Sequence, residues 1–134
     1  LDVSASGMSA QSVRLNTTAS NLANANSVSS SVDKTYRARH PVFAAELNKA
    51  QGQQSPNVKV KVMGIVESQA PLTLEYLPDH PMADDNGFIF RSNVNVVEEM
   101  ANMMSASRAY ETNVQIADAA KQMLSKTLQL GKSQ

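Results

Sequence analysis

Apolar side chains recur with heptad-like spacing at both ends of this 134-residue chain. Near the N-terminus they follow alternating steps of four and three, and near the C-terminus they recur every seven residues. This spacing predicts two long helices, each with an apolar stripe along one face that needs a partner. The stripe residues are Leu1, Ala5, Met8, Leu15, Ala19 and Leu22, then Val96, Met103, Tyr110, Ala117 and Leu124, with Met100, Val114 and Leu128 beside them.

The bounds of both helices follow from local signals. The first helix is expected to end at about Asn26, and through residue 32 only Asp2 and Arg14 carry charge, so this helix lacks the usual solvated face. The last helix is expected from about Asn95, with its acids before its bases, an order that suits the helix macrodipole. Gly131 is its expected stop.

Between the helices the periodicity changes from helical to alternating. Residues 27–32 are almost all serine and valine, which predicts a connector. Apolar and polar residues alternate over 58–62 and 72–76, which predicts half-buried strands with a turn at 68–71. An Asp-Asn-Gly run at 85–87 predicts a second turn before an apolar strand. The middle of the chain is therefore expected to form a small antiparallel β region.

The predicted fold class is mainly α with a small β insert. The N- and C-terminal helices are expected to bury their stripes by pairing as a coiled-coil-like hairpin. We expect three segments: residues 1–26 and 93–134 form one helical domain, and residues 27–92 form the connector and the β region. With three tyrosines, three phenylalanines and no tryptophan, the core is small. The helices are therefore expected to need neighbouring copies for stability.

Composition argues against several classes of partner and site. Lys plus Arg equals Asp plus Glu, so no net charge favours nucleic acid or an anionic membrane. The chain has no cysteine, which removes disulfides, thiolate zinc sites and cysteine catalysis. No apolar run approaches the roughly 20 residues that span a bilayer, and no secretory signal is visible. Membrane insertion is therefore not expected.

The sequence gives little support for a catalytic site or a metal site. His40 and His80 each precede a proline, which favours extended or turn conformations. No nucleophile elbow supports a Ser-His-Asp set. The acidic segment 79–87 is superficially like a calcium loop, but alignment on its glycine places Met82 and Asn93 at two positions that need acidic ligands. We therefore expect no catalytic residue, no metal and no cofactor.

Two groups of residues have alternative interpretations. Met100, Met103 and Met104 are explained by ordinary helix packing or by an adaptable binding surface, because methionine repacks easily. Asn21 and Asn24 either cap the end of the first helix or form hydrogen bonds between packed helices. Self-assembly is compatible with both interpretations of the methionines.

Longer motifs resemble a known family. Residues 4–11, 14–16 and 19–26 resemble the opening of the flagellar basal-body rod family, and residues 93–100 and 105–113 resemble its C-terminal motif. Residues 67–71 and 79–93 are most similar to its proximal rod members. The resemblance implies a structural subunit, not an enzyme. The terminal helices would form an inner tube around the export channel, with the β insert outside.

The resemblance also implies location and partners. The protein would lie in the rod that crosses the periplasm and transmits torque, after export by the flagellar type III apparatus. Its partners would be other copies of itself, other rod proteins and the rod-base adapter. The residues expected to pack and assemble are Leu1, Met8, Leu15, Leu22, Asn21, Asn24, Val96, Met100, Met103, Tyr110, Ala117 and Leu124.

Two other functions compete with the rod. A soluble export chaperone or helical binding module would present the methionine-rich face to a partner. A cell-wall hydrolase would need a catalytic acid with a matching base, which the sequence does not supply in a recognisable setting.

Overall fold

The computed structural model describes residues 2–47 and 58–132. The chain has a long helix at each end and antiparallel strands between them in sequence, so the predicted combination of terminal helices and a β insert is confirmed. The elements are α1 (Asp2–Ala23), β1 (Val28–Ser29), the short 3-10 helix η1 (Val32–Lys34), β2 (Arg39–Leu47), β3 (Val58–Glu67), β4 (Thr73–Tyr76), β5 (Phe88–Arg91) and α2 (Val96–Lys132). Leu1 lies outside the described residues.

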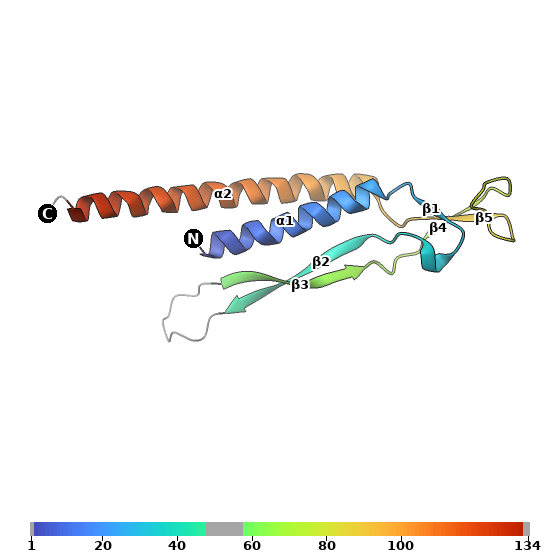
Figure 1. Cartoon of the computed structure of the whole chain (residues 1–134), viewed down its shortest axis with the longest axis horizontal. Helices are drawn as coiled ribbons and strands as arrows, with labels where there is room; N and C mark the ends of the chain where they lie inside the picture. The colour runs from blue at the N-terminus through green and yellow to red at the C-terminus, as the bar shows by residue number, and fades with distance from the viewer. Residues whose placement is uncertain (1, 48–57, 133–134) are drawn as a thin grey trace.

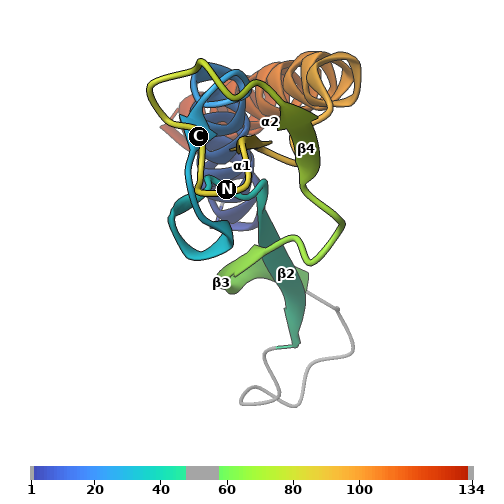
Figure 2. The same ribbon diagram turned by 90° about the vertical axis from the view of Figure 1, so that its right-hand side faces the viewer.

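The molecule is elongated, and its helices run side by side in opposite directions (Figure 1). The β2–β3 ribbon packs on α1, on the side away from α2, so that α1 is the middle layer of three (Figure 2). The sheet of β1, β5 and β4 lies at the end of the molecule farthest from both termini (Figure 1). The central helix α1 is therefore the element that holds the layers together.

Helix α1 ends three residues before the expected Asn26, at Ala23. The amide and the hydroxyl of Ser27 both donate to the carbonyl of Asn24, at 3.1 and 2.8 Å, and this closes a turn after the helix. The Asn24 side chain donates to the carbonyl of Ser20 at 2.9 Å and stays local. These local hydrogen bonds close the end of α1, so the helix does not continue to Asn26.

Helix α2 begins where Asn95 accepts a hydrogen bond from the Glu98 amide at 3.1 Å, as an N-cap residue does. Its first turn carries Glu98 and Glu99, which suits the positive end of the helix dipole. The expected stop at Gly131 is wrong, because α2 continues to Lys132 and Gly131 does not adopt a positive φ. The helix has 37 residues and is about 55 Å long.

The strands form two separate antiparallel sheets. Strand β2 pairs with β3, and the second sheet has the order β1, β5, β4. The predicted strands at 58–62, 72–76 and 88–90 are present, but 68–71 connects two sheets instead of closing one hairpin. The connector predicted at 27–32 includes β1, which pairs with β5 through Ser29 and Phe90. Strand β2, which contains His40, was not predicted.

The turn before β5 depends on Gly87. The Asp84 carboxylate accepts hydrogen bonds from the amides of Asn86 and Phe88 at 2.9 and 2.8 Å, so this acid shapes a turn. Gly87 has a φ of +87°, a region that side chains with a Cβ rarely adopt. A Cβ at Gly87 would also lie 2.8 Å from Cε2 of Tyr76.

Gly87→Ala is expected to lower the free energy of unfolding by about 2 kcal/mol, because the backbone strain and the contact with Tyr76 add. Urea unfolding followed by circular dichroism measures the change. Gly64→Ala is the matched control, since nothing lies within 4 Å of a Cβ there and its φ is not positive. Equal effects of the two substitutions would contradict this account of the turn.

Candidate assembly surface

The fully buried side chains of α1 and α2 are all polar or small. On α2 the buried side chains are Glu99 and Ala106, and on α1 they are Ser4, Ala10, Thr17, Thr18 and Asn21. No stripe residue within the described ranges is fully buried, so the coiled-coil-like pairing of the two stripes is not confirmed for the single subunit. Small residues allow close approach of the helices, and the polar ones require specific partners.

Asn21 is the centre of a buried hydrogen-bond network. It is completely buried, and its amide nitrogen donates to the carbonyl of Arg39 at 2.8 Å and to the carboxylate of Glu99 at 3.0 Å. Its amide oxygen accepts from the Tyr36 hydroxyl at 2.7 Å and from the Arg39 amide at 2.9 Å. One side chain on α1 thus joins α2, β2 and the segment before β2.

Two more contacts fix the register of the helix pair. The Arg14 guanidinium donates to the Asn102 side chain at 3.1 Å. A Cβ on Gly7 would lie 3.0 Å from the amide of Asn113, so the helices approach closely there. Because the helices are antiparallel, Asp2 lies near about residue 118, and α2 extends beyond the described part of α1. Figure 1 shows this extension.

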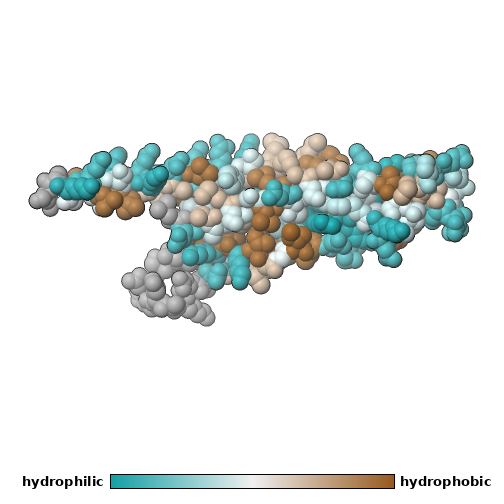
Figure 3. Space-filling view, in the orientation of Figure 1, coloured by the Kyte–Doolittle hydropathy of each residue, from teal (hydrophilic) through white to brown (hydrophobic). Residues whose placement is uncertain are grey.

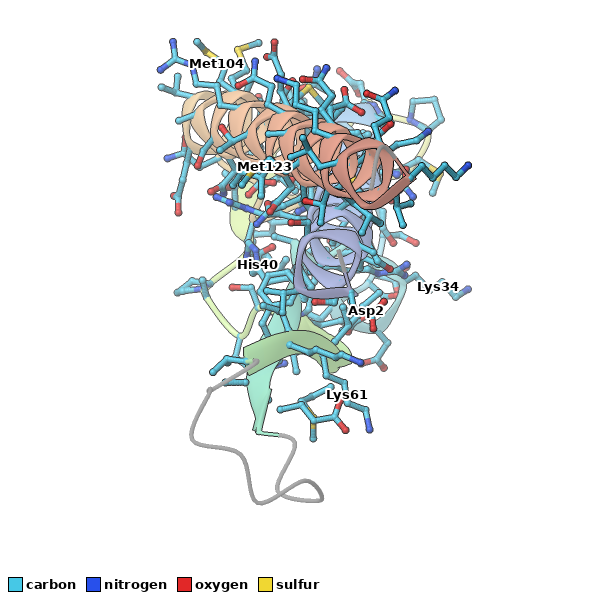
Figure 4. All side chains as sticks on the ribbon, turned by 90° about the vertical axis from the view of Figure 1, so that its left-hand side faces the viewer. Asp2, Lys34, His40, Lys61, Met104 and Met123 are labelled. Carbon is cyan, nitrogen blue, oxygen red and sulfur yellow. The ribbon has the colours of Figure 1, made fainter. Side chains whose placement is uncertain are left out.

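The extended end of α2 carries apolar side chains. All of residues 121–132 are exposed, including Met123, Leu124 and Leu128 at 70, 52 and 59 %. Figure 3 shows apolar surface near this end of α2 and across the middle of the molecule. In Figure 4, Met104 lies on the side of α2 away from α1. Much of the apolar face of α2 is therefore open in the single subunit.

The residues expected to assemble fall into three groups. Asn21 is buried between the elements. Tyr110 is 39 % exposed. Exposed with Tyr110 are Val96, Met100 and Leu124, while Met8, Leu15, Leu22, Asn24, Met103 and Ala117 are half-buried. The structure therefore brings Asn21 into a defined network and leaves several stripe residues accessible.

Some structural residues were missed by sequence reasoning. Asn93 accepts a hydrogen bond from the Ala38 amide at 2.7 Å and donates to the carbonyls of Ser68 and Ala70, so it links the segments that lead into the two sheets. Glu99 was considered only as one of the acids that suit the helix dipole, but it is 3 % exposed and bonds to Asn21. Nothing in the spacing of these residues identifies their partners.

The histidines have separate structural settings. His40 lies in β2, and Nδ1 of His80 accepts a hydrogen bond from the Met82 amide at 3.0 Å. Within the described ranges, no three His, Cys, Asp or Glu residues gather as a metal site. Neither described helix combines the length and apolar character needed to cross a membrane.

Comparisons with known proteins agree along the chain. The family model described as "Flagella basal body rod protein" matches residues 1–29, and the model "Flagellar basal body rod FlgEFG protein C-terminal" matches residues 85–130. These two matches contain α1 and most of α2.

Curated relatives match nearly the whole chain. The flagellar basal-body rod protein FlgC of Salmonella typhimurium is 48 % identical over 130 residues, covering 97 % of this chain and 94 % of that protein. FlgC of Yersinia enterocolitica is 42 % identical with the same coverage, and FlgC of Agrobacterium fabrum is 35 % identical over 98 % of this chain and 92 % of its own. The chain therefore belongs to the flagellar basal-body rod protein FlgC family and is a structural component of the basal-body rod.

Proposed function

We propose that α1 and α2 assemble helically with neighbouring subunits to form a hollow, torque-transmitting shaft, the proximal part of the rod. The observation that supports this most directly is the apolar surface of α2, which is exposed in one subunit. Burial of apolar surface contributes about 25 cal/mol per Å². Repetition of one contact by a screw operation gives many parallel interfaces, which is what stiffness against torque requires.

The proposal assigns different roles to the helical ends and to the middle of the chain. Residues 1–26 and 93–134 form the axial core, and residues 27–92 form the connector and the outer β region. In the assembled rod the two helices act as a coiled-coil-like hairpin, whose outer stripes meet other subunits. The contact residues are those named above as expected to assemble, from Leu1 to Leu124.

The proposed partners are other copies of this chain, other rod proteins and the rod-base adapter. The flagellar type III apparatus exports the subunit, which then lies where the rod crosses the periplasm. We propose no catalytic activity, because the named relatives are rod proteins and the polar network around Asn21 is occupied by internal hydrogen bonds. The rod family matches disfavour the alternative of a soluble chaperone or binding module.

Hydrogen exchange tests the proposal. The described apolar core is small, so the purified subunit is expected to be folded but of low stability, and the amides of residues 2–23 and 96–132 should exchange through frequent opening. In isolated basal bodies the same amides should exchange at least about 100-fold more slowly, because neighbouring subunits bury them. Absence of the chain from basal bodies, or unchanged exchange of both helices, would overturn the proposal.

A further inference from the structure

Arg14 lies at the contact between α1 and α2. It is the one basic residue of α1, it is half-buried, and its side chain reaches toward α2. Its hydrogen-bond partners are the neutral amides of Asn102 at 3.1 Å and Gln11 at 3.5 Å. Among the described residues no carboxylate lies within ion-pair distance of it, and the same holds for the half-buried Arg37, whereas Arg39 and Arg91 each have one. A guanidinium with only neutral partners remains well suited to bind a carboxylate through two parallel hydrogen bonds.

A cavity adjoins this guanidinium. It has a volume of about 130 Å³ and is lined by Arg14, Thr18, His40, Pro41, Phe43 and Asn102, from α1, β2 and α2. In Figure 4, His40 lies beside α1, between α2 and the β2–β3 ribbon. The volume is well below the roughly 300–1,000 Å³ of ordinary small-molecule pockets. An acidic side chain fits this space, but a nucleotide does not.

Two groups in the cavity lack internal partners. Thr18 is only 5 % exposed, and its hydroxyl forms no hydrogen bond with any residue that the structure describes. The His40 ring likewise has no partner within the described ranges. Among the described residues no fully buried polar side-chain atom lacks a hydrogen-bond partner, so the Thr18 hydroxyl reaches the open space of the cavity and can donate to a ligand there. The guanidinium beside it favours a ligand with negative charge.

We propose that this cavity is a carboxylate site, filled in the rod by an acidic side chain from a second copy of this chain. This inference rests on the proposed function. A carboxylate accepts two parallel hydrogen bonds from a guanidinium and can accept a third from the Thr18 hydroxyl. The chain can supply the acid, since Glu111 and Asp118 on α2 are exposed and form no ion pair with any described residue.

Cross-linking in isolated basal bodies tests the site. Arg14→Lys retains the positive charge and provides an amine that a carbodiimide joins to a carboxylate in direct contact. We expect a link from position 14 to an Asp or Glu of another copy, identified by peptide mass spectrometry. Asn16→Lys is the matched control, because Asn16 is exposed two residues away on the other side of α1.

The outcomes distinguish a failure of the proposed rod function from a failure of the carboxylate site. If the wild-type chain is absent from basal bodies, the proposed function fails. If Arg14→Lys is incorporated but position 14 links to no other copy, or links only to a different rod protein, the second-copy assignment is overturned. An equal link from Asn16→Lys to the same acid would overturn the role of the cavity.

A second measurement separates a subunit carboxylate from a free one. The purified chain is titrated with sodium acetate and with sodium chloride at equal ionic strength, and the amide resonance of Thr18 is followed by NMR. Acetate alone should shift it, and Arg14→Gln should weaken the response about tenfold or more. No acetate response overturns the carboxylate site. A response without a cross-link assigns the site to a free small carboxylate and overturns the subunit as the source.

Discussion

Asn21→Leu is expected to lower the free energy of unfolding of the isolated subunit by about 3–5 kcal/mol. Leucine has the same branched shape but forms none of the four hydrogen bonds that Asn21 makes with Tyr36, Arg39 and Glu99. The loss leaves the buried Glu99 carboxylate and the backbone of Arg39 without these partners, and each such group costs about 1–3 kcal/mol. Urea unfolding followed by circular dichroism measures the change.

Asn24→Ala is the matched control for this prediction. Asn24 is also an amide at the end of α1, but it is half-buried and its side chain bonds only to the carbonyl of Ser20 in its own helix. Its removal is expected to cost less than about 1 kcal/mol. If both substitutions destabilise the subunit equally, the network across the layers is not what stabilises it.

Tyr36→Phe removes only part of the hydrogen-bond network around Asn21. It removes the hydroxyl that donates to Asn21 at 2.7 Å and contacts Ser20 at 3.1 Å, but it leaves the bond from Asn21 to Glu99 intact. The expected cost is therefore intermediate. The order Asn21→Leu, Tyr36→Phe, Asn24→Ala is the signature of one side chain that holds three layers together.

The helices could be predicted because their periodicity is local. The seven-residue spacing from Val96 to Leu124 requires nothing beyond the sequence of α2, and the Asp-Asn-Gly turn needs only Gly87. The resemblance to the rod family likewise depended on contiguous motifs, and the comparisons confirm it. Features encoded within one element were thus predicted well.

The layers could not be predicted because their contacts join distant residues. The bond from Asn21 to Glu99 spans 78 positions, and neither residue is apolar, so the apolar pattern did not reveal this α1–α2 contact. Strand β2 was missed because Pro41 and two alanines weaken its β pattern, although it pairs with β3 along its length. Hydrogen-bond partners across layers leave no periodic signal.

The fully buried side chains of α1 and α2 are polar or small, which explains why apolar stripes remain exposed. In the subunit, the buried Asn21 joins α1 to Glu99 of α2 through a specific hydrogen bond. Apolar residues such as Met100 and Leu124 lie outside this contact and are 55 and 52 % exposed. Methionine and leucine tolerate varied neighbours, which suits contacts with non-equivalent subunits.

Tyr110→Asp is expected to abolish rod assembly and motility in cells that depend on this chain. Tyr110 lies on the proposed outer stripe and is 39 % exposed in the subunit, so the isolated chain should fold almost normally. At an interface between subunits the added carboxylate loses its hydration, at a cost of several kcal/mol in every copy. Leu22→Asp should also block assembly, but Leu22 is half-buried and its effect includes the fold of the subunit.

Thr112→Asp separates this stripe from the rest of α2. It places the same charge two residues away, about 200° around the helix, at another exposed position. Swarming diameter, electron microscopy of basal bodies and circular dichroism of each purified chain form the measurement. Tyr110→Asp should give folded subunits without rods, and Thr112→Asp should give near-normal swarming. Normal motility with Tyr110→Asp would show that the stripe does not contact neighbours, whereas equal loss with both would show that all of α2 is enclosed.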